Sequence, residues 1–99
     1  MPADKPMAYE VELTRRAERD VRRIAERASQ RRIVERISLL ADNPRPADAK
    51  KLRGPGEIWR IRTGDWRVCY QIRDRVLLVL VLIVGRRASV YERLTRRLG

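Results

Sequence analysis

Residues 57–72 read EIWRIRTGDWRVCYQI, two strand-like runs on either side of the dipeptide Gly64-Asp65. Aromatic and β-branched residues alternate with polar ones in both runs, which is the period-2 pattern of a half-buried strand. A glycine-containing dipeptide between two such runs is typical of a two-residue hairpin turn. The segment therefore predicts an antiparallel hairpin.

The Gly64-Asp65 turn also determines which residues oppose one another. The predicted cross-strand pairs are Arg62–Arg67, Ile61–Val68 and Trp59–Tyr70. Because side chains alternate between the faces of a strand, the apolar pairs share the core side, and Arg60, Arg62 and Arg67 share the opposite side. Opposed like charges destabilise a sheet, and no acidic residue alternates with these arginines within the hairpin. The pattern favours either an anion-binding surface or solvated arginines whose stems cover apolar neighbours.

The chain before the hairpin predicts one strand followed by two helices. Apolar and acidic residues alternate over 9–13, which indicates a strand, and Thr14 is a suitable N-cap for a helix from about Thr14 to Ala28. A second amphipathic helix follows and ends at Asp42-Asn43-Pro44, because proline cannot continue it. The acidic residues interspersed in these helices are expected on ordinary solvated surface; they are Glu18, Asp20, Glu26 and Glu35.

From residue 50 onward the sequence predicts an antiparallel meander and a final helix. The expected strands are Lys50–Arg53, Glu57–Thr63, Trp66–Ile72 and Val76–Val84. The last strand has no polar alternation, which favours a central strand covered on both faces and ended by Gly85. Ser89 and Glu92 have the spacing of a capping box, so a helix is expected to start near Val90.

Together these elements predict a single α+β domain over residues 1–99, with residues 1–6 as a disordered polar leader. The predicted order is β-α-α-β-β-β-β-α, an antiparallel sheet packed against an N-terminal helical hairpin. At this length folding buries roughly two-thirds of the chain's surface, which suffices for one core but not for a large substrate pocket as well. The longest apolar run is too short to span a bilayer, and we expect a cytoplasmic protein.

The chain is strongly basic, with 24 Lys and Arg against 13 Asp and Glu, a net charge of +11 and a pI near 11.3. Most of the excess belongs to the second half of the chain. Histidine is absent and Cys69 is the only cysteine, which excludes imidazole catalysis, histidine-ligated metals, multi-cysteine zinc sites and an intrachain disulfide. We therefore expect no cofactor and no metal, and Cys69 is expected to be an inert strand residue.

A second basic group follows the last strand. Arg86 and Arg87 are expected near one edge of the sheet, with Tyr91 in the first turn of the final helix. Guanidinium groups bind phosphate, and a phenol stacks on a base or forms a hydrogen bond to it. Combined with the hairpin arginines, this group indicates nucleic-acid binding.

Several motifs resemble the RelE/ParE superfamily of toxins from type II toxin–antitoxin systems. They are Lys51-Leu52-Arg53-Gly54, Trp59-Arg60-Ile61-Arg62, Gly64-Asp65-Trp66-Arg67-Val68-Cys69-Tyr70, Val84-Gly85-Arg86-Arg87 and Val90-Tyr91. The resemblance spans Met7 to Leu98 and is specific in order and spacing. It implies the small RNase-like fold of that family and, for the RelE branch, an mRNA interferase that cuts the message in the ribosomal A site.

The resemblance also implies roles for individual residues. The implied catalytic positions are Arg60, Arg62, Arg67, Arg87 and Tyr91, and the implied RNA-binding positions are Lys51, Arg53 and Arg86. RelE is similar but has lysines where this chain has Arg60 and Arg62, and a guanidinium is a poor general base. Either Tyr91 or a ribosomal group then accepts the proton of the attacking 2′-hydroxyl, or the step relies on alignment and electrostatic stabilisation.

The expected partners are a cognate acidic antitoxin, the ribosome and messenger RNA, with no membrane partner. Toxin and antitoxin are expected to form a hetero-oligomer that binds operator DNA through the antitoxin. Two other functions stay open: a ParE-like toxin that inhibits DNA gyrase without cutting RNA, and a non-catalytic basic RNA-binding module. The cluster of Arg86, Arg87 and Tyr91 favours the RelE branch, because a gyrase binder needs no such cluster.

Overall fold

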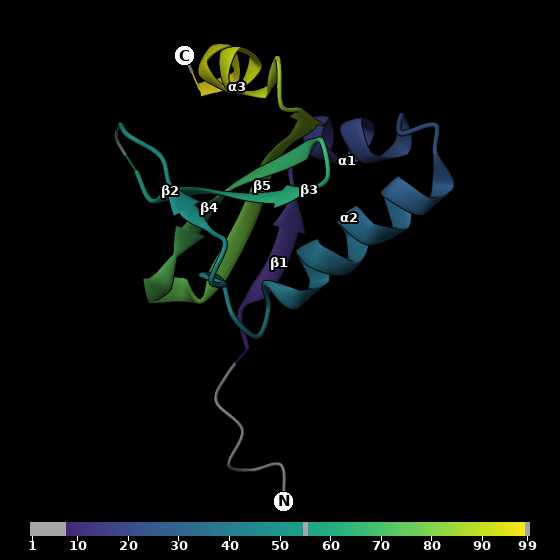
Figure 1. Ribbon diagram of the computed structural model, residues 1–99. Coiled ribbons are helices and arrows are strands. Elements are labelled where there is room, and N and C mark those ends of the chain that lie inside the picture. The colour runs from purple at the N-terminus through teal and green to yellow at the C-terminus, as the bar shows by residue number, and fades with distance from the viewer. Residues whose placement is uncertain (1–7, 55, 99) are drawn as a thin grey trace, which may run out of the picture.

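The computed structural model of the chain describes residues 8–54 and 56–98, and the expected leader at residues 1–6 lies outside these ranges. The elements are β1 (Glu10–Leu13), α1 (Arg15–Arg22), α2 (Arg27–Leu39), β2 (Lys50–Lys51), β3 (Ile58–Thr63), β4 (Trp66–Arg73), the 3₁₀ helix η2 (Asp74–Val76), β5 (Leu78–Arg86) and α3 (Val90–Leu98). Their order confirms the predicted β-α-α-β-β-β-β-α arrangement, with η2 as an additional turn (Figure 1).

The strands form one sheet in the order β1-β5-β4-β3-β2. β2 to β5 are antiparallel to their neighbours, as the meander predicts. β1 differs, because it pairs with β5 in parallel from Glu10–Leu78 to Leu13–Val81. The long connection through two helices and three strands allows this direction, since only closely connected strands are constrained to be antiparallel.

Helices cover both faces of the sheet. α1 and α2 pack on one face, where the buried core includes Ile33, Ile37, Val68, Tyr70 and Val81. α3 packs on the other face over a smaller cluster of Ile58, Cys69, Ile83, Val90 and Leu94. The α1–α2 packing confirms the predicted helical hairpin against the sheet, and α3 makes the molecule three layers deep at one end (Figure 1).

The prediction of one helix from Thr14 to Ala28 is wrong, because α1 ends early and a short break separates it from α2. The side-chain amide of Gln30 in α2 donates to the carbonyl of Val21 at 2.8 Å, which satisfies one carbonyl at the end of α1. Thr14 caps α1 as predicted, since its hydroxyl oxygen accepts the backbone N–H of Ala17 at 3.1 Å.

The last strand is shifted toward the C-terminus relative to its predicted range. Val76 belongs to η2 and is 67% exposed, and Leu77 adopts a positive φ of 52°, so β5 begins only at Leu78. At its other end β5 continues through Gly85 to Arg86, because both residues extend the pairing with β4. The predicted position between two neighbours is confirmed, since β5 lies between β1 and β4.

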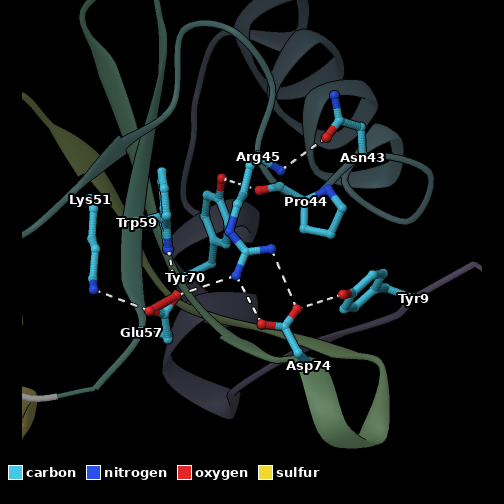
Figure 2. A network of polar contacts seen from close by, with 9 residues as sticks. All are labelled: Tyr9, Asn43, Pro44, Arg45, Lys51, Glu57, Trp59, Tyr70 and Asp74. Atoms are coloured by element: carbon cyan, nitrogen blue, oxygen red, sulfur yellow. Dashed lines mark hydrogen bonds and ion pairs between the residues drawn. The ribbon is translucent and has the colours of Figure 1, made fainter.

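A polar network closes the end of the sheet where β1 begins (Figure 2). Arg45, in the loop after α2, pairs with Asp74 at 2.9 Å and with Glu57 at 3.3 Å, and its guanidinium lies 5.3 Å from the ring centroid of Trp59. Asp74 also accepts a hydrogen bond from the hydroxyl of Tyr9 at 2.5 Å. These contacts tie the start of β1 and the end of β4 to the loop between α2 and β2.

Within the described residues, no helix is long and apolar enough to cross a membrane.

Candidate nucleic-acid interface

The predicted register of the β3–β4 hairpin is confirmed. Its pairs include Arg62–Arg67, Ile61–Val68 and Trp59–Tyr70. Gly64 adopts a positive φ of 61°, a conformation that favours glycine and allows the tight turn. Arg60 and Arg62 alternate with the core residues of β3, so they share the face of the sheet that α3 covers.

The three hairpin arginines differ sharply in exposure. Arg60 is 5% exposed and Arg67 is 8% exposed, whereas Arg62 is exposed. Arg60 lies opposite the buried Cys69, and its Nε atom is buried without a hydrogen-bond partner. The alternative of three splayed, solvated arginines is therefore wrong for Arg60 and Arg67, because both side chains are buried.

Arg67 and Arg87 both contact the hairpin turn. Nη1 of Arg67 donates to the carbonyls of Gly64 at 3.0 Å and Trp66 at 3.1 Å. The backbone N–H of Arg87 donates to the carbonyl of Asp65 at 2.9 Å. The turn therefore holds the chain after β5 beside the hairpin, and it brings Arg87 to the same end of the sheet as Arg62 and Arg67.

Tyr91 and Arg53 line one cavity of about 200 Å³ between α3 and the chain that follows β2. Its walls also include Leu52, Ile58 and Leu94. Tyr91 is 41% exposed, so its ring is open to a ligand. Ile58 lies on the same face of β3 as Arg60, so this cavity lies on the face of the hairpin arginines, at the end of β3 away from the turn.

Two predicted RNA-binding residues lie apart from this face. Lys51 pairs with Glu57 at 3.1 Å in the network at the other end of β3, so it does not join the arginines (Figure 2). Arg86 lies opposite Trp66, and its guanidinium is 4.5 Å from the centroid of that ring. Trp66 packs against the core formed with α1 and α2, so Arg86 belongs to the other face of the sheet.

The arginines at the turn end have no acidic counterpart. Across residues 8–54 and 56–98, no carboxylate oxygen lies within 4.0 Å of the side-chain nitrogens of Arg60, Arg62, Arg67, Arg86 or Arg87. The same ranges contain no group of three or more His, Cys, Asp or Glu residues able to hold a metal ion. Burial raises the pKa of Cys69 to about 12, so its thiol stays protonated at neutral pH, consistent with an inert strand residue. The chemistry available here is anion binding by guanidinium groups and a phenol.

The prediction that Asp20 lies on solvated surface is wrong, because its side chain is only 7% exposed. β1 pairs with β5 only as far as Val81, and beyond that point β5 has an unpaired edge. Asp20 accepts the backbone N–H of Val84 at 3.0 Å, and Arg97 of α3 donates to the carbonyl of Leu82 at 2.8 Å. These two side chains take the place of a neighbouring strand.

The same carboxylate anchors α3. Asp20 pairs with Arg97 at 2.9 Å and with Arg93 at 3.1 Å. It therefore joins α1, β5 and the helix that carries Tyr91. The sequence does contain a signal for this role, since Asp20 follows Ala17 by three residues and precedes Ile24 by four, on the same helical stripe as these buried residues.

Known proteins are similar to this chain in sequence and in fold. A family model described as "ParE toxin of type II toxin-antitoxin system, parDE" matches residues 11–91. The mRNA interferase toxin RelE of Escherichia coli strain K12 is 29% identical over 96 residues, which are 93% of this chain and 99% of that protein.

Solved structures agree with the sequence comparison. The archaeal RelE–RelB complex from Pyrococcus horikoshii OT3 matches with a TM-score of 0.73 and 28% identity, over 82% of this chain and 97% of that one. The toxin–antitoxin complex RelBE2 from Mycobacterium tuberculosis matches with a TM-score of 0.69 and 29% identity, over 81% and 99% of the two chains. The chain belongs to the ParE toxin family of type II toxin–antitoxin systems, within the RelE/ParE superfamily.

Proposed function

We propose that this toxin is a ribosome-dependent endoribonuclease that cuts messenger RNA in the A site. The observation that carries the proposal is the group of arginines at the hairpin turn, which has no carboxylate partner within the described residues. The cavity lined by Tyr91 and Arg53 lies on the same face of the sheet. Such a surface suits a phosphodiester backbone with an adjacent base. The relative named mRNA interferase toxin RelE supports the same class of reaction.

The side chains that this protein offers indicate how it would cleave RNA. Without histidines or a cluster of metal ligands in the described residues, the chain supplies no cation to generate hydroxide from water. The available nucleophile is the 2′-hydroxyl next to the scissile phosphate. Its oxygen attacks phosphorus and loses its proton, the bond to the 5′-oxygen breaks, and the leaving 5′-oxygen takes a proton from water. The products carry a 2′,3′-cyclic phosphate and a 5′-hydroxyl.

The position of each side chain determines its part in the cleavage reaction. Arg62, exposed beside Arg67, binds the phosphate and stabilises the charge that develops on its oxygens. Arg87, held at the turn, does the same at the leaving oxygen. Tyr91 stacks on or orients the nucleotide. Because Arg60 is a guanidinium, the proton of the 2′-hydroxyl goes to Tyr91 or to a ribosomal group.

A cognate acidic antitoxin in the cytoplasm is part of the proposal. A net charge of +11 gives the toxin a strong attraction for acidic partners as well as for RNA. Two matching structures are described as complexes of RelE with RelB and as a toxin–antitoxin complex, which supports a similar pair here. Toxin and antitoxin together would bind operator DNA through the antitoxin.

The direct test is incubation of the purified toxin with translating ribosomes, followed by mapping of the message ends. We expect cuts in the A site, 5′-hydroxyl products, no effect of EDTA at a concentration that leaves the ribosomes intact, and no cleavage at a 2′-deoxy position. Cuts with 5′-phosphate ends, or loss of cleavage in EDTA, would refute the metal-free scheme.

A second function is favoured by the family model, whose description names ParE toxins. In that case the chain would inhibit DNA gyrase and leave RNA intact, as the resemblance to the ParE branch implies. A supercoiling assay with purified gyrase, run beside the ribosome assay, separates the two functions. Inhibition of supercoiling together with uncut message would assign the chain to the ParE branch.

A further inference from the structure

A second basic cavity lies behind the hairpin arginines, on the other face of the sheet. It measures about 210 Å³ and is formed where α1 ends, β5 ends and α3 begins. Its lining includes Arg23, Arg86, Arg93 and Trp66. This is the unpaired part of β5, where β1 no longer covers the edge of the sheet.

The cavity carries an excess of positive charge. Its lining includes Arg23, Arg86 and Arg93 but a single carboxylate, that of Asp20. This carboxylate already accepts hydrogen bonds from Arg93 and Arg97, so it is not available to neutralise the other two arginines. Arg23 and Arg86 are both exposed, and neither forms an ion pair with a carboxylate of residues 8–54 and 56–98, so both can bind an external anion.

Trp66 and Arg86, which both line the cavity, offer a flat surface. The guanidinium of Arg86 lies 4.5 Å from the ring centroid of Trp66, and Trp66 is itself partly exposed. Nucleobases stack on both indole rings and guanidinium planes, and these stacks tolerate any base. An acidic peptide would use the charges of the cavity but would gain nothing from this stacked pair, which favours RNA as the occupant.

The cavity is continuous with the site proposed above. Trp66 and Arg67 are neighbours on β4 whose side chains point to opposite faces, and Arg86 and Arg87 follow each other at the end of β5. The basic surface therefore passes around the turn end of the sheet, from Arg62 and Arg67 on one face to Arg86 on the other. A single RNA strand bound to the first face can continue into the second.

We propose that this cavity is a nucleotide subsite, in which Arg23 and Arg86 bind a backbone phosphate and a base stacks against the Arg86–Trp66 pair. The nucleotide it holds neighbours the one that is cut. The inference rests on the proposed function for its choice of RNA as ligand. It adds Arg23 and Trp66, which the comparison with the family does not assign, to the RNA-binding surface.

The test is binding of an RNA hexanucleotide with 2′-O-methyl groups on every ribose, which cannot be cut. We expect Arg23→Gln and Arg86→Gln each to weaken the Kd by about tenfold, corresponding to about 1.4 kcal/mol. Each variant should also reduce the slope of log affinity against log salt by up to about 0.7, the value for one whole phosphate contact, because both arginines bind the same phosphate. Arg22→Gln is the matched control, since Arg22 is exposed on the same helix but does not line the cavity.

A second readout reports on stacking. The chain has two tryptophans, so Trp59→Phe leaves Trp66 as the only indole. Quenching of Trp66 fluorescence should saturate at the same Kd as oligonucleotide binding. Unchanged Kd and salt slope in Arg23→Gln and Arg86→Gln would overturn the proposal, as would loss of affinity in these variants for a polyglutamate peptide alone.

The two proposals fail in different ways. If the wild-type protein binds the methylated hexanucleotide through Arg23 and Arg86 but leaves ribosomal message uncut, the subsite stands and the nuclease is wrong. If it cuts the message while neither variant alters binding, the nuclease stands and the subsite is wrong.

Discussion

Arg62 and Arg67 face each other across β3 and β4, yet their surroundings differ. Arg62 is exposed, and its carbonyl accepts a hydrogen bond from Arg36 at 3.1 Å. Arg67 is buried and its guanidinium holds the turn through Gly64 and Trp66. The sequence pattern gives no reason to distinguish these two residues. Their burial does, because the exposed Arg62 is available to bind RNA, whereas the buried Arg67 also stabilises the turn.

Replacing Arg62 by Ala should leave the free energy of unfolding unchanged or raise it by about 0.2–1 kcal/mol, because the repulsion between opposed arginines is relieved. Replacing Arg67 by Ala should lower it by about 1–3 kcal/mol, because two buried contacts with the turn are lost. Both variants should cut RNA far more slowly. Chemical denaturation and cleavage assays, with the exposed Arg75→Ala as control, check both parts. A large stability loss in Arg62→Ala would mean that this residue is structural.

Tyr91 combines a stacking face with a phenol, and a single substitution separates the two. Tyr91→Phe keeps the ring, which is open at the cavity shared with Arg53, and removes only the hydroxyl. If the phenol takes part in proton transfer or alignment, we expect the single-turnover cleavage rate to fall at least tenfold while RNA affinity stays the same. An unchanged rate would leave Tyr91 with stacking alone.

At the scale of the elements, Asp20 connects three of them. Its carboxylate receives the N–H of Val84 and the guanidinium groups of Arg93 and Arg97. Removing one partner of a buried ion pair leaves an uncompensated charge. Asp20→Ala should therefore lower the free energy of unfolding by about 3–5 kcal/mol. Thermal and urea unfolding measure this loss, and Glu18→Ala, an exposed acidic neighbour, is the matched control. A loss below about 1 kcal/mol would contradict the anchoring role.

The network at the opposite end of the sheet predicts a dependence of stability on pH (Figure 2). Hydrogen bonds from Arg45 and then Tyr9 lower the pKa of Asp74, and those from Trp59 and Lys51 lower the pKa of Glu57. A carboxyl whose pKa is lower in the folded than in the unfolded state stabilises the fold at pH values above its pKa in the unfolded chain. That contribution is lost as the pH falls through the folded pKa.

The melting temperature of the wild type should therefore fall as the pH drops from about 5 to 2. In Asp74→Asn the fall should be shallower, because one of the two carboxyls no longer titrates. Melting curves at a series of pH values, with Asp42→Asn as a control outside the network, test this. Equal falls of the melting temperature with pH in wild type and Asp74→Asn would show that Asp74 contributes no stability.

Local signals predict the elements that local interactions form. The Gly64-Asp65 turn suffices for the register of β3 and β4, and Thr14 for the start of α1. The parallel pairing of β1 with β5 joins residues more than sixty positions apart, and no local pattern encodes it. The burial of Asp20 depends on its contacts with Arg93 and Arg97 of α3, a helix equally remote in sequence.

At the scale of the whole molecule, the net charge and the arginines at the turn end predict different dependences of RNA affinity on salt. For single-stranded RNA the slope of log affinity against log salt is roughly −0.7 for each neutralised phosphate. If all eleven excess charges acted, the slope would be about −8. If RNA contacts only the arginines around the turn end, about five phosphates are bound and the slope should lie between about −3 and −4.

We expect the smaller slope, because basic residues outside the turn end, such as Arg31 and Arg32 of α2, contribute only a long-range field that salt screens. Titrations of a 2′-O-methyl RNA of about 20 nucleotides, which carries more than eleven phosphates, at about 50 to 300 mM salt give the slope directly, and Arg62→Ala should reduce it by about 0.7. Replacement of Arg31 and Arg32, two exposed arginines of α2, should slow association at low salt and leave the slope unchanged. A slope near −8, or one reduced equally by the α2 variant, would mean that the protein binds RNA with its entire surface rather than at a site.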